Sequence, residues 1–407
     1  MLRCVTNISF VQQPSASSPA RTKTLTYNFV HEFEAEDSWA DLTNGGKITL
    51  PKNVYVKDAT GKSVPLGGTN VNIGGFDNNA PLFLKGDQVT IIAGYKYFNG
   101  QKKEVISTNQ IFAGFVSGVS SKKPIQVICE DNMFKLKQII APNKVFPASQ
   151  YTLEGILTEL LQGTGFTVNV LTDTSFGDFR TQNETVAEVL ARLKKDYHFE
   201  SYFRGNELRS GATVYIENDA IADGQKVFHF QDNIISDELE YKRKDDINLS
   251  AIAYSVNKNE LQVTTKDGNV KTRKERLEVL VSIRNDGNFT KSIKPAGSKA
   301  DFAPNTAGER RTFYFWNITD PNQLITLAEN QLKKYYYTGL RGHFTTFGLP
   351  FVQQGDNVDI LDDVLPERNG RYKVKAVKYK GGVGGLRQEI HLDYQITKLD
   401  ANGNPIS

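Results

Sequence analysis

Apolar and polar residues alternate along three short stretches between residues 86 and 131, which is the pattern of half-buried β-strands. The first stretch opens with Gly86-Asp87-Gln88-Val89. A polar arm, 96–110, contains a turn at Asn99-Gly100, and the chain then returns through 113–119 and 125–131. Three short strands joined by turns predict a small antiparallel barrel.

The same pattern recurs near the C-terminus. Gly355-Asp356-Asn357-Val358 repeats the opening motif, and 369–377 repeats the glycine-plus-aromatic return strand. A third strand, 388–396, places Ile390, Leu392, Tyr394 and Ile396 on one face. A degenerate repeat at opposite ends of a chain predicts two related barrels, the first of which carries the inserted arm.

Between the repeats the hydrophobic period changes from two to 3.6 residues. A helix is predicted where Leu153, Ile156, Leu157, Leu160 and Leu161 share one side. Thr185-Val186-Ala187-Glu188 is a capping box that opens a second helix with Val186, Val189, Leu190 and Leu193 facing inward. Strands at 166–171, 199–203 and 208–216 complete a compact α/β insert.

The remaining segments are rich in strand patterns. Strands are predicted at 24–30, 47–51, 227–230, 237–242, 249–256, 261–265, 277–281, 311–316 and 343–347, with one helical turn at 38–42. A helix is predicted from Pro321 to Tyr337, capped by Asp320. Residues 294–309 are rich in Pro, Gly, Ser, Ala and Asn, which predicts a mobile loop.

These patterns predict an α+β, mainly β protein. Two related small β-barrel domains flank an α/β insert and a further β-rich segment. The predicted domains are 1–150 (N-terminal β-rich segment and first barrel), 151–220 (α/β insert), 221–318 (β-rich segment with the mobile loop) and 319–407 (helix and second barrel).

Composition narrows the possible functions. The 49 basic and 46 acidic residues nearly cancel, so charge gives no argument for a specific nucleic-acid partner. The two cysteines, Cys4 and Cys129, exclude a disulfide framework. No apolar run approaches the ~20 residues that span a bilayer, and the N-terminus does not resemble a signal peptide. We therefore expect synthesis in the cytoplasm and no membrane insertion.

No residue pattern predicts a catalytic, cofactor-binding or metal-binding site. The five histidines (His31, His198, His229, His343 and His391) share no ligand-like spacing, so structural or solvated roles are expected. Asp356, Asp359, Asp362 and Asp363 do not match a calcium loop, and we interpret them as the solvent face of a strand followed by an acidic turn.

Three further clusters favour structural roles. The glycines of 381–385 precede a strand, not a helix, so a hairpin end is expected in place of a phosphate loop. The basic runs 242–244 and 271–276 stand among acidic residues and predict a solvated face. Of Tyr335-Tyr336-Tyr337, one or two are expected in the core and the outermost at an interface.

The order of these parts resembles the central baseplate hub proteins of tailed phages, also called late control D proteins. The resemblance rests on the two Gly-Asp-x-Val openings, on 130–137 after the first barrel, and on 185–193 followed by 203–208 in the α/β unit. The chain is also similar to the N-terminal part of type VI secretion spike proteins and to hubs of other contractile injection systems. The resemblance covers most of 80–396.

The resemblance implies a structural virion protein of the tail or baseplate, with no enzyme activity and no cofactor. In that family two barrel domains per subunit make a pseudo-six-fold ring as a homotrimer, which joins the tail tube to the central spike. The implied partners are the tail tube protein, the central spike protein and other baseplate proteins, with the tape-measure protein as a further candidate. The arm 96–110 and the loop 294–309 are our candidate contacts with neighbouring tail proteins.

Two other classes stay open. One is a tail-associated carbohydrate-active or cell-wall-degrading enzyme, because the spacing of paired carboxylates is spatial and invisible in a sequence. The other is a carbohydrate-binding adhesin at the tail tip. Clustered exposed tryptophans would favour the adhesin, but the chain has only Trp39 and Trp316.

Overall fold

The computed structural model describes most of the chain. The described residues are 2–17, 19, 21–51, 55–57, 63–65, 81–120, 124–147, 149–170, 178–197, 199–212, 226–244, 248–264, 270–284, 287–294, 302, 308–316, 318 and 320–406. His198 and most of the predicted loop 294–309 lie outside them.

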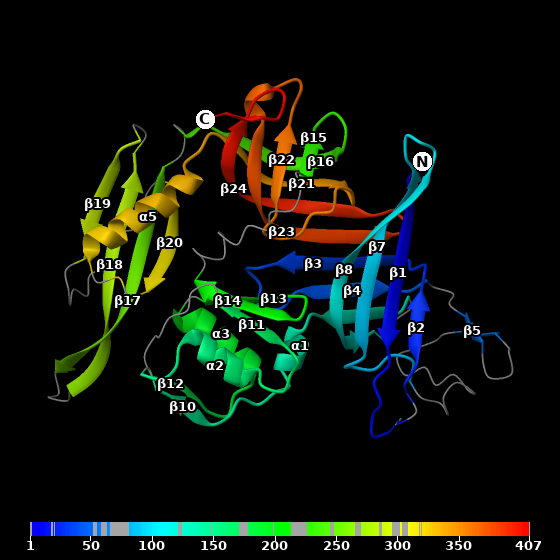
Figure 1. Cartoon of the computed structure of the whole chain (residues 1–407), viewed down its shortest axis with the longest axis horizontal. Coiled ribbons are helices and arrows are strands. Elements are labelled where there is room, and N and C mark those ends of the chain that lie inside the picture. Colours follow the sequence, from blue (N-terminus) through cyan, green and yellow to red (C-terminus); the bar gives the residue numbers. More distant parts are fainter. Residues whose placement is uncertain are drawn as a thin grey trace.

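Fourteen of the described strands form one continuous sheet in the order β16-β21-β24-β23-β3-β4-β9-β8-β7-β1-β2, with β15, β22 and β25 paired beside this path (Figure 1). Their bounds are β1 Arg3–Val11, β2 Thr24–Tyr27, β3 Glu32–Ser38, β4 Gly45–Thr49, β7 Gln88–Phe98, β8 Glu104–Val119, β9 Gln126–Glu130, β15 Lys226–His229, β16 Ile234–Lys242, β21 Gly339–Phe347, β22 Asn357–Leu361, β23 Gly370–Gly382, β24 Arg387–Leu399 and β25 Pro405–Ile406. A separate short pair is formed by β5 (Tyr55–Lys57) and β6 (Ser63–Pro65).

Both predicted repeats are present as three successive antiparallel strands. In the first, β7 pairs with β8 and β8 with β9. In the second, β22 pairs with β23 and β23 with β24. Ile390, Leu392 and Tyr394 are buried as expected, whereas Ile396 is exposed. The described pairings do not close either repeat into a barrel: none joins β9 back to β7 or β24 back to β22, and both repeats are part of the one sheet.

Strands β3 and β4 join the two repeats. β3 pairs with β23 of the second repeat, and β4 pairs with β9 of the first. Phe33 and Ile48 from these strands are fully buried, and burying such a side chain contributes about 1.5–3 kcal/mol. The helical turn expected at 38–42 is a bend, in which the Ser38 N–H donates to the Asn44 side chain (3.0 Å).

The α/β insert has the predicted composition. Helices α2 (Leu153–Leu160) and α3 (Val186–Tyr197) lie beside a three-stranded sheet in the order β11-β14-β13 (Figure 1). The strands are β11 Thr167–Val170, β13 Phe199–Arg204 and β14 Glu207–Ala212. The capping box forms as predicted, with reciprocal hydrogen bonds between Thr185 and Glu188 (2.7 and 3.2 Å). Short α1 (Met133–Leu136) and the pair β10 (Lys144–Phe146) and β12 (Phe179–Thr181) complete this part.

A second sheet lies apart from the first, in the order β19-β18-β17-β20, with α5 across it (Figure 1). Its strands are β17 Leu249–Thr264, β18 Val270–Ile283, β19 Phe289–Ile293 and β20 Glu309–Trp316. The strands predicted at 249–256 and 261–265 are one long strand with an irregular register between Val256 and Glu260. Helix α5 runs from Pro321 to Tyr335, and the Asp320 carboxylate accepts the Asn322 N–H (3.0 Å) as an N-cap.

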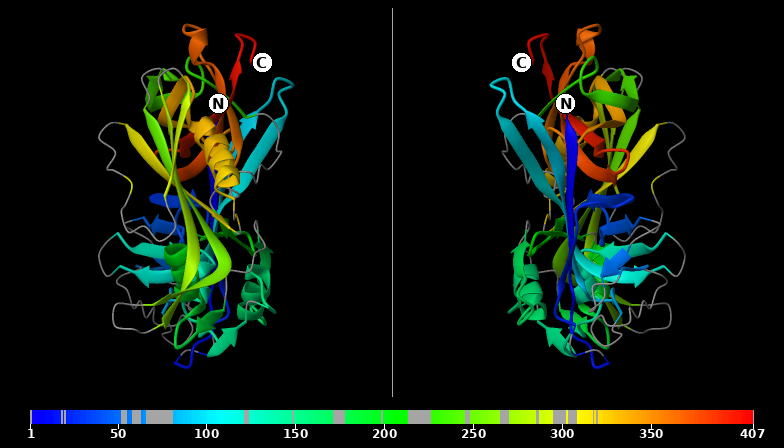
Figure 2. Two further views of the ribbon diagram at one scale, coloured as in Figure 1. Left: turned by 90° about the vertical axis from the view of Figure 1, so that its left-hand side faces the viewer. Right: turned by 90° about the vertical axis from the view of Figure 1, so that its right-hand side faces the viewer.

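The mainly β, α+β class predicted from the sequence is therefore confirmed. In the side views the N-terminus, the C-terminus and the tip of the β7–β8 hairpin lie at the same end of the molecule (Figure 2). Within the described part of the chain, no helix is both long enough and apolar enough to cross a bilayer.

Candidate functional site

The Gly86-Asp87 turn opens β7 of the first repeat. The Gly86 N–H donates to the Val116 carbonyl (2.8 Å), and the Val116 N–H donates to the Asp87 carbonyl (2.8 Å). The Asp87 N–H donates to the Leu84 carbonyl (3.1 Å), and the Asp87 carboxylate accepts the Leu84 N–H (2.8 Å). Gly86 has φ +97°, a conformation that favours glycine because it has no Cβ.

The Gly355-Asp356 turn repeats this network bond for bond. Gly355 and Asp356 exchange hydrogen bonds with Val374 (2.9 Å each), and the Asp356 N–H donates to the Gln353 carbonyl (3.2 Å). The Asp356 carboxylate accepts the Gln353 N–H (2.6 Å), and Gly355 has φ +79°. The repeated Gly-Asp-x-Val motif therefore corresponds to a repeat of the same backbone hydrogen bonds.

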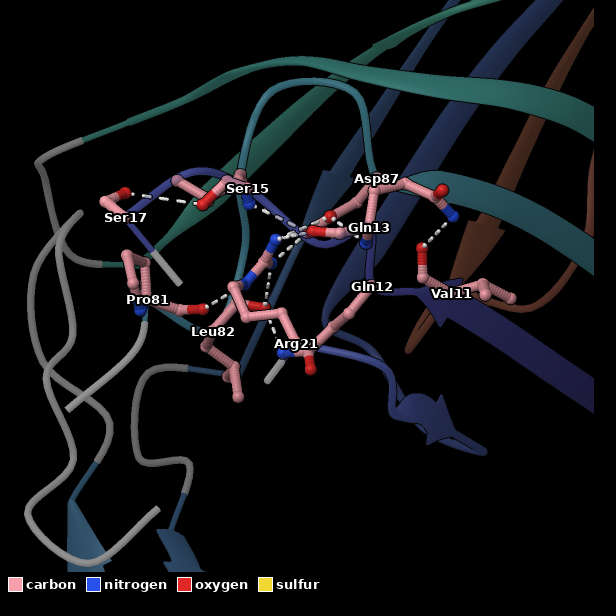
Figure 3. A network of polar contacts seen from close by, with 10 residues as sticks. Val11, Gln12, Gln13, Ser15, Ser17, Arg21, Pro81, Leu82 and Asp87 are labelled. Atoms are coloured by element: carbon pink, nitrogen blue, oxygen red, sulfur yellow. Dashed lines mark hydrogen bonds and ion pairs between the residues drawn. The ribbon is translucent and has the colours of Figure 1, made fainter. Parts of the chain in front are cut away.

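A buried arginine neutralises the first turn (Figure 3). Arg21 donates from two nitrogens to the two oxygens of Asp87 (2.9 and 2.5 Å), and both side chains are 0% exposed. Arg21 also donates to the carbonyls of Pro81 (2.9 Å) and Gln13 (2.8 Å). Planar bidentate pairing suits arginine, and the extra bonds satisfy its remaining donors. Through these bonds the ion pair holds the N-terminal segment at Gln13 and Arg21 against the turn.

A lysine takes the same place in the second turn. Lys226, at the start of β15, donates to one oxygen of Asp356 (2.6 Å). Asp356 is buried, whereas the Lys226 side chain is 15% exposed. The other carboxylate oxygen, Oδ1, has no hydrogen-bond partner among the described residues. The second turn is therefore held by fewer bonds than the first.

A small polar cavity of about 110 Å³ lies where both repeats meet the α/β insert. Asp37 of β3 accepts the Gln354 N–H (3.1 Å), and Arg204 of β13 donates to the Gln354 carbonyl (2.9 Å). Burial raises the pKa of Asp37 to about 6, although the Gln354 hydrogen bond and the Arg204 charge lower it. Asp37 is therefore a titrating neighbour of the second turn.

Asp131 lines the same cavity on the side of the first repeat. Its carboxylate accepts the N–H groups of Asn44 (3.2 Å) and Met133 (3.0 Å), which ties the β3–β4 connection to the start of α1. Burial raises the pKa of Asp131 to about 7 against the effect of these two bonds.

One face of the sheet carries a groove of about 700 Å³ where the repeats join. Charged side chains from neighbouring strands pair across it, as Lys380 of β23 does with Glu34 of β3 (2.9 Å). The charged lining residues are four basic and four acidic: Lys47, Lys378, Lys380, Arg387, Glu34, Glu36, Glu130 and Glu389. A balanced surface of this kind does not attract a polyanion such as nucleic acid.

The structure brings together two histidines that are far apart in the sequence. His343 of β21 lies opposite His391 of β24, and their rings stack with centroids 4.7 Å apart. Glu389 contacts His391 (2.7 Å) and Glu238 lies 3.6 Å from His343. Burial lowers the pKa of His391. Among the described residues, no group of three or more His, Cys, Asp or Glu side chains is arranged to hold a metal ion.

The solvent-face interpretation of the acidic cluster is wrong for Asp356 and Asp359, whereas the turn expected at Asp362 and Asp363 is present with the Asp362 carboxylate buried in it. Asp356, Asp359 and Asp362 are buried, and Asp363 alone of the four is exposed. Asp359 receives two bonds from Arg371 (2.6 and 2.9 Å). Asp362 accepts the N–H groups of 364 and 365 (3.0 and 3.1 Å). Arg371 on the neighbouring strand therefore takes the place of solvent for Asp359, and the backbone of the following turn does so for Asp362.

The glycine cluster at 381–385 and the basic run at 242–244 both make contacts within the fold. Gly381 and Gly382 end β23 in the hairpin to β24, and a Cβ on Gly382 would meet the His31 carbonyl at 2.3 Å. Lys242 pairs with Glu240 (2.8 Å). The side chains of 271–275 lie outside the described ones.

Two of the three adjacent tyrosines enter the core. Tyr335 and Tyr337 are buried, and Tyr336 is half-buried and donates to the Arg284 carbonyl (3.3 Å). Cys4 and Cys129 are free thiols, and burial raises the pKa of Cys129 to about 12.

Comparison with known proteins identifies the fold. No protein-family model matches the chain, and no curated protein matches it. Among solved structures, the chain is similar to the prophage MuSo2 43 kDa tail protein from Shewanella oneidensis (TM-score 0.51, 13% identity, 96% of this chain and 98% of that chain). It is also similar to a tail protein from Neisseria meningitidis MC58 (TM-score 0.49, 11% identity, 96% of each chain).

A lower similarity extends to an Escherichia coli component of the type VI secretion system (TM-score 0.40, 8% identity, 93% of this chain and 76% of that chain). The likeness to the Shewanella protein spans nearly the whole of both chains. The chain therefore has the fold of a phage tail protein, as the resemblance in its sequence predicted.

Proposed function

We propose that this chain is a structural hub protein of a phage tail or baseplate. Three copies would form a pseudo-six-fold ring that joins the tail tube to the central spike. The observation that carries the proposal is the duplicated Gly-Asp turn, with its identical hydrogen bonds, in two halves of one continuous sheet. Two similar halves in each of three subunits give six similar units around one axis.

The fold supports the same proposal independently of the repeat. The Shewanella protein that shares it over 96% of this chain is a tail protein. In a tail the partners would be the tube, the spike and other baseplate proteins, and the location would be the virion. A permanent interface of this kind buries upwards of ~2,000 Å².

The experiment is the mass of the purified protein in solution, measured by light scattering over a range of concentrations. A ring of three copies has three times the 45.5 kDa of one chain. A mass that stays at one copy at all concentrations contradicts a self-assembling ring. Turnover of peptidoglycan by the same preparation would replace the proposal with the cell-wall-degrading alternative.

A further inference from the structure

The tip of the β7–β8 hairpin carries apolar side chains that no described part of the chain covers. Phe98 is 65% exposed and Ile106 is 61% exposed. They share one face, because Phe98 lies opposite Glu104 and Ile106 lies opposite Lys96, which itself pairs with Glu104. Exposed apolar side chains rimmed by charges are typical of interaction surfaces.

Strand β8 has a free edge along the same hairpin. Its pairing with β9 begins at Phe115. From Glu104 to Gly114, β7 is its one partner among the described strands. The backbone N–H and C=O groups of such an edge are available to a further strand.

A second free edge lies at the far end of the sheet, on β16. Among the described strands, β16 pairs with β21 alone. Ile235 on this strand is 44% exposed, and the Leu239 N–H donates to the Asp237 carboxylate of its own strand (3.3 Å). In the side views the hairpin (cyan) and β16 (green) lie on opposite sides of the molecule (Figure 2).

The two edges have opposite charge. The hairpin from 96 to 104 carries three lysines and one glutamate. Strand β16 carries Asp237, Glu238 and Glu240 against one lysine, and these three acidic side chains are exposed. Two β16 edges would place like charges face to face, whereas a hairpin against β16 places opposite charges together. The charge pattern thus disfavours pairing of like edges and favours pairing of unlike ones.

We propose that the hairpin 96–106 of one copy of this chain docks against β16 of the next copy, edge to edge. Phe98 and Ile106 then lie against the surface around Ile235, and Lys102 and Lys103 face the acidic side chains of β16. Because the two surfaces differ, the contact is head-to-tail, the type of interface that builds a ring when the rotation between copies closes and an open filament when it does not. This inference rests on the proposed ring and names the surfaces that close it.

The test is a charge-swap experiment on the full chain. One variant carries Lys102→Glu with Lys103→Glu, a second carries Glu238→Lys with Glu240→Lys, and a third combines all four. Each pair alone places like charges across the contact, so we expect the dissociation constant of the assembly to rise at least tenfold. The combined variant restores opposite charges and should recover most of the affinity.

Two controls separate this contact from general effects. Lys195→Glu changes an exposed lysine on the α/β insert and should leave the assembly unchanged. An unaltered unfolding temperature shows that each swap folds. If the wild type forms a trimer but the swaps leave its affinity unchanged, or the combined variant does not recover, the assigned surfaces are wrong while the hub proposal stands. A wild type that stays monomeric at every concentration overturns both.

Discussion

The two Gly-Asp turns have the same backbone hydrogen bonds but are neutralised differently. Asp87 shares two bonds with a fully buried arginine, whereas Asp356 receives one bond from a partly exposed lysine and lies near the titrating Asp37. The turn geometry is therefore set by the local motif, and the cation is supplied by whichever distant segment packs there. The first turn anchors the N-terminal segment, while the second anchors β15, the first described strand after the α/β insert.

The largest effect is expected from Arg21→Met. It leaves the Asp87 carboxylate buried without a cation, which costs about 3–5 kcal/mol. Hydrogen exchange of the Leu84 amide, whose proton is donated to Asp87, measures the loss locally. Arg21→Lys keeps the charge but loses the bidentate geometry, so its loss of stability should lie between zero and that of Arg21→Met. Unchanged protection of Leu84 in Arg21→Met would contradict the anchoring role.

Lys226→Met should cost less, about 1–3 kcal/mol, because the Lys226 side chain is partly exposed and gives Asp356 one hydrogen bond in place of two. Exchange of the Gln353 amide is the matching local probe, since its proton is donated to Asp356. If Lys226→Met reduces the stability at Gln353 as much as Arg21→Met reduces it at Leu84, the two turns depend equally on their cations and the proposed difference between them is wrong.

The second turn should also respond to pH through Asp37. Burial raises its pKa in the folded state to about 6, above the value in an unfolded chain. The folded state therefore binds this proton more tightly, so the contribution to stability is complete below about pH 4 and is lost as the pH rises through about 6.

The expected loss between pH 4 and 7 is roughly 1–3 kcal/mol at the Gln353 amide. Asp37→Asn removes the ionisation and should flatten this part of the profile, while the Leu84 amide in the first turn serves as the internal control. A profile that is the same in Asp37→Asn and wild type would assign the pH dependence to other groups.

The smallest effect is expected from the glycines, and it should be similar in the two turns. Gly86→Ala and Gly355→Ala each force a side chain into a positive φ, at a cost of about 1–2 kcal/mol. A Cβ on Gly86 would meet no atom within 4 Å, so strain alone is expected there. Chemical unfolding of the two variants compares the costs. A difference of several kcal/mol between them would show that the turns are less alike than their hydrogen bonds.

The elements that depend on neighbouring residues were determined by the sequence alone. The capping box at Thr185, the cap at Asp320 and the inward faces of α2 and α3 follow from side chains within one or two helical turns. The local half of each Gly-Asp turn belongs to this group too, because Asp87 and Asp356 each bond a residue three positions earlier. The bonds to Val116 and Val374 also need the return strand of each repeat.

Tertiary structure decided the features that join distant segments. β3, with its alternating glutamates, has little intrinsic strand preference and forms because it fits between β23 and β4. Arg21 is 66 positions from Asp87, and His343 meets His391 through strand register. The burial of Asp359 depends in the same way on Arg371. Periodicity reports which face of a strand is apolar, but the partner that covers a polar side chain is chosen only when the chain folds.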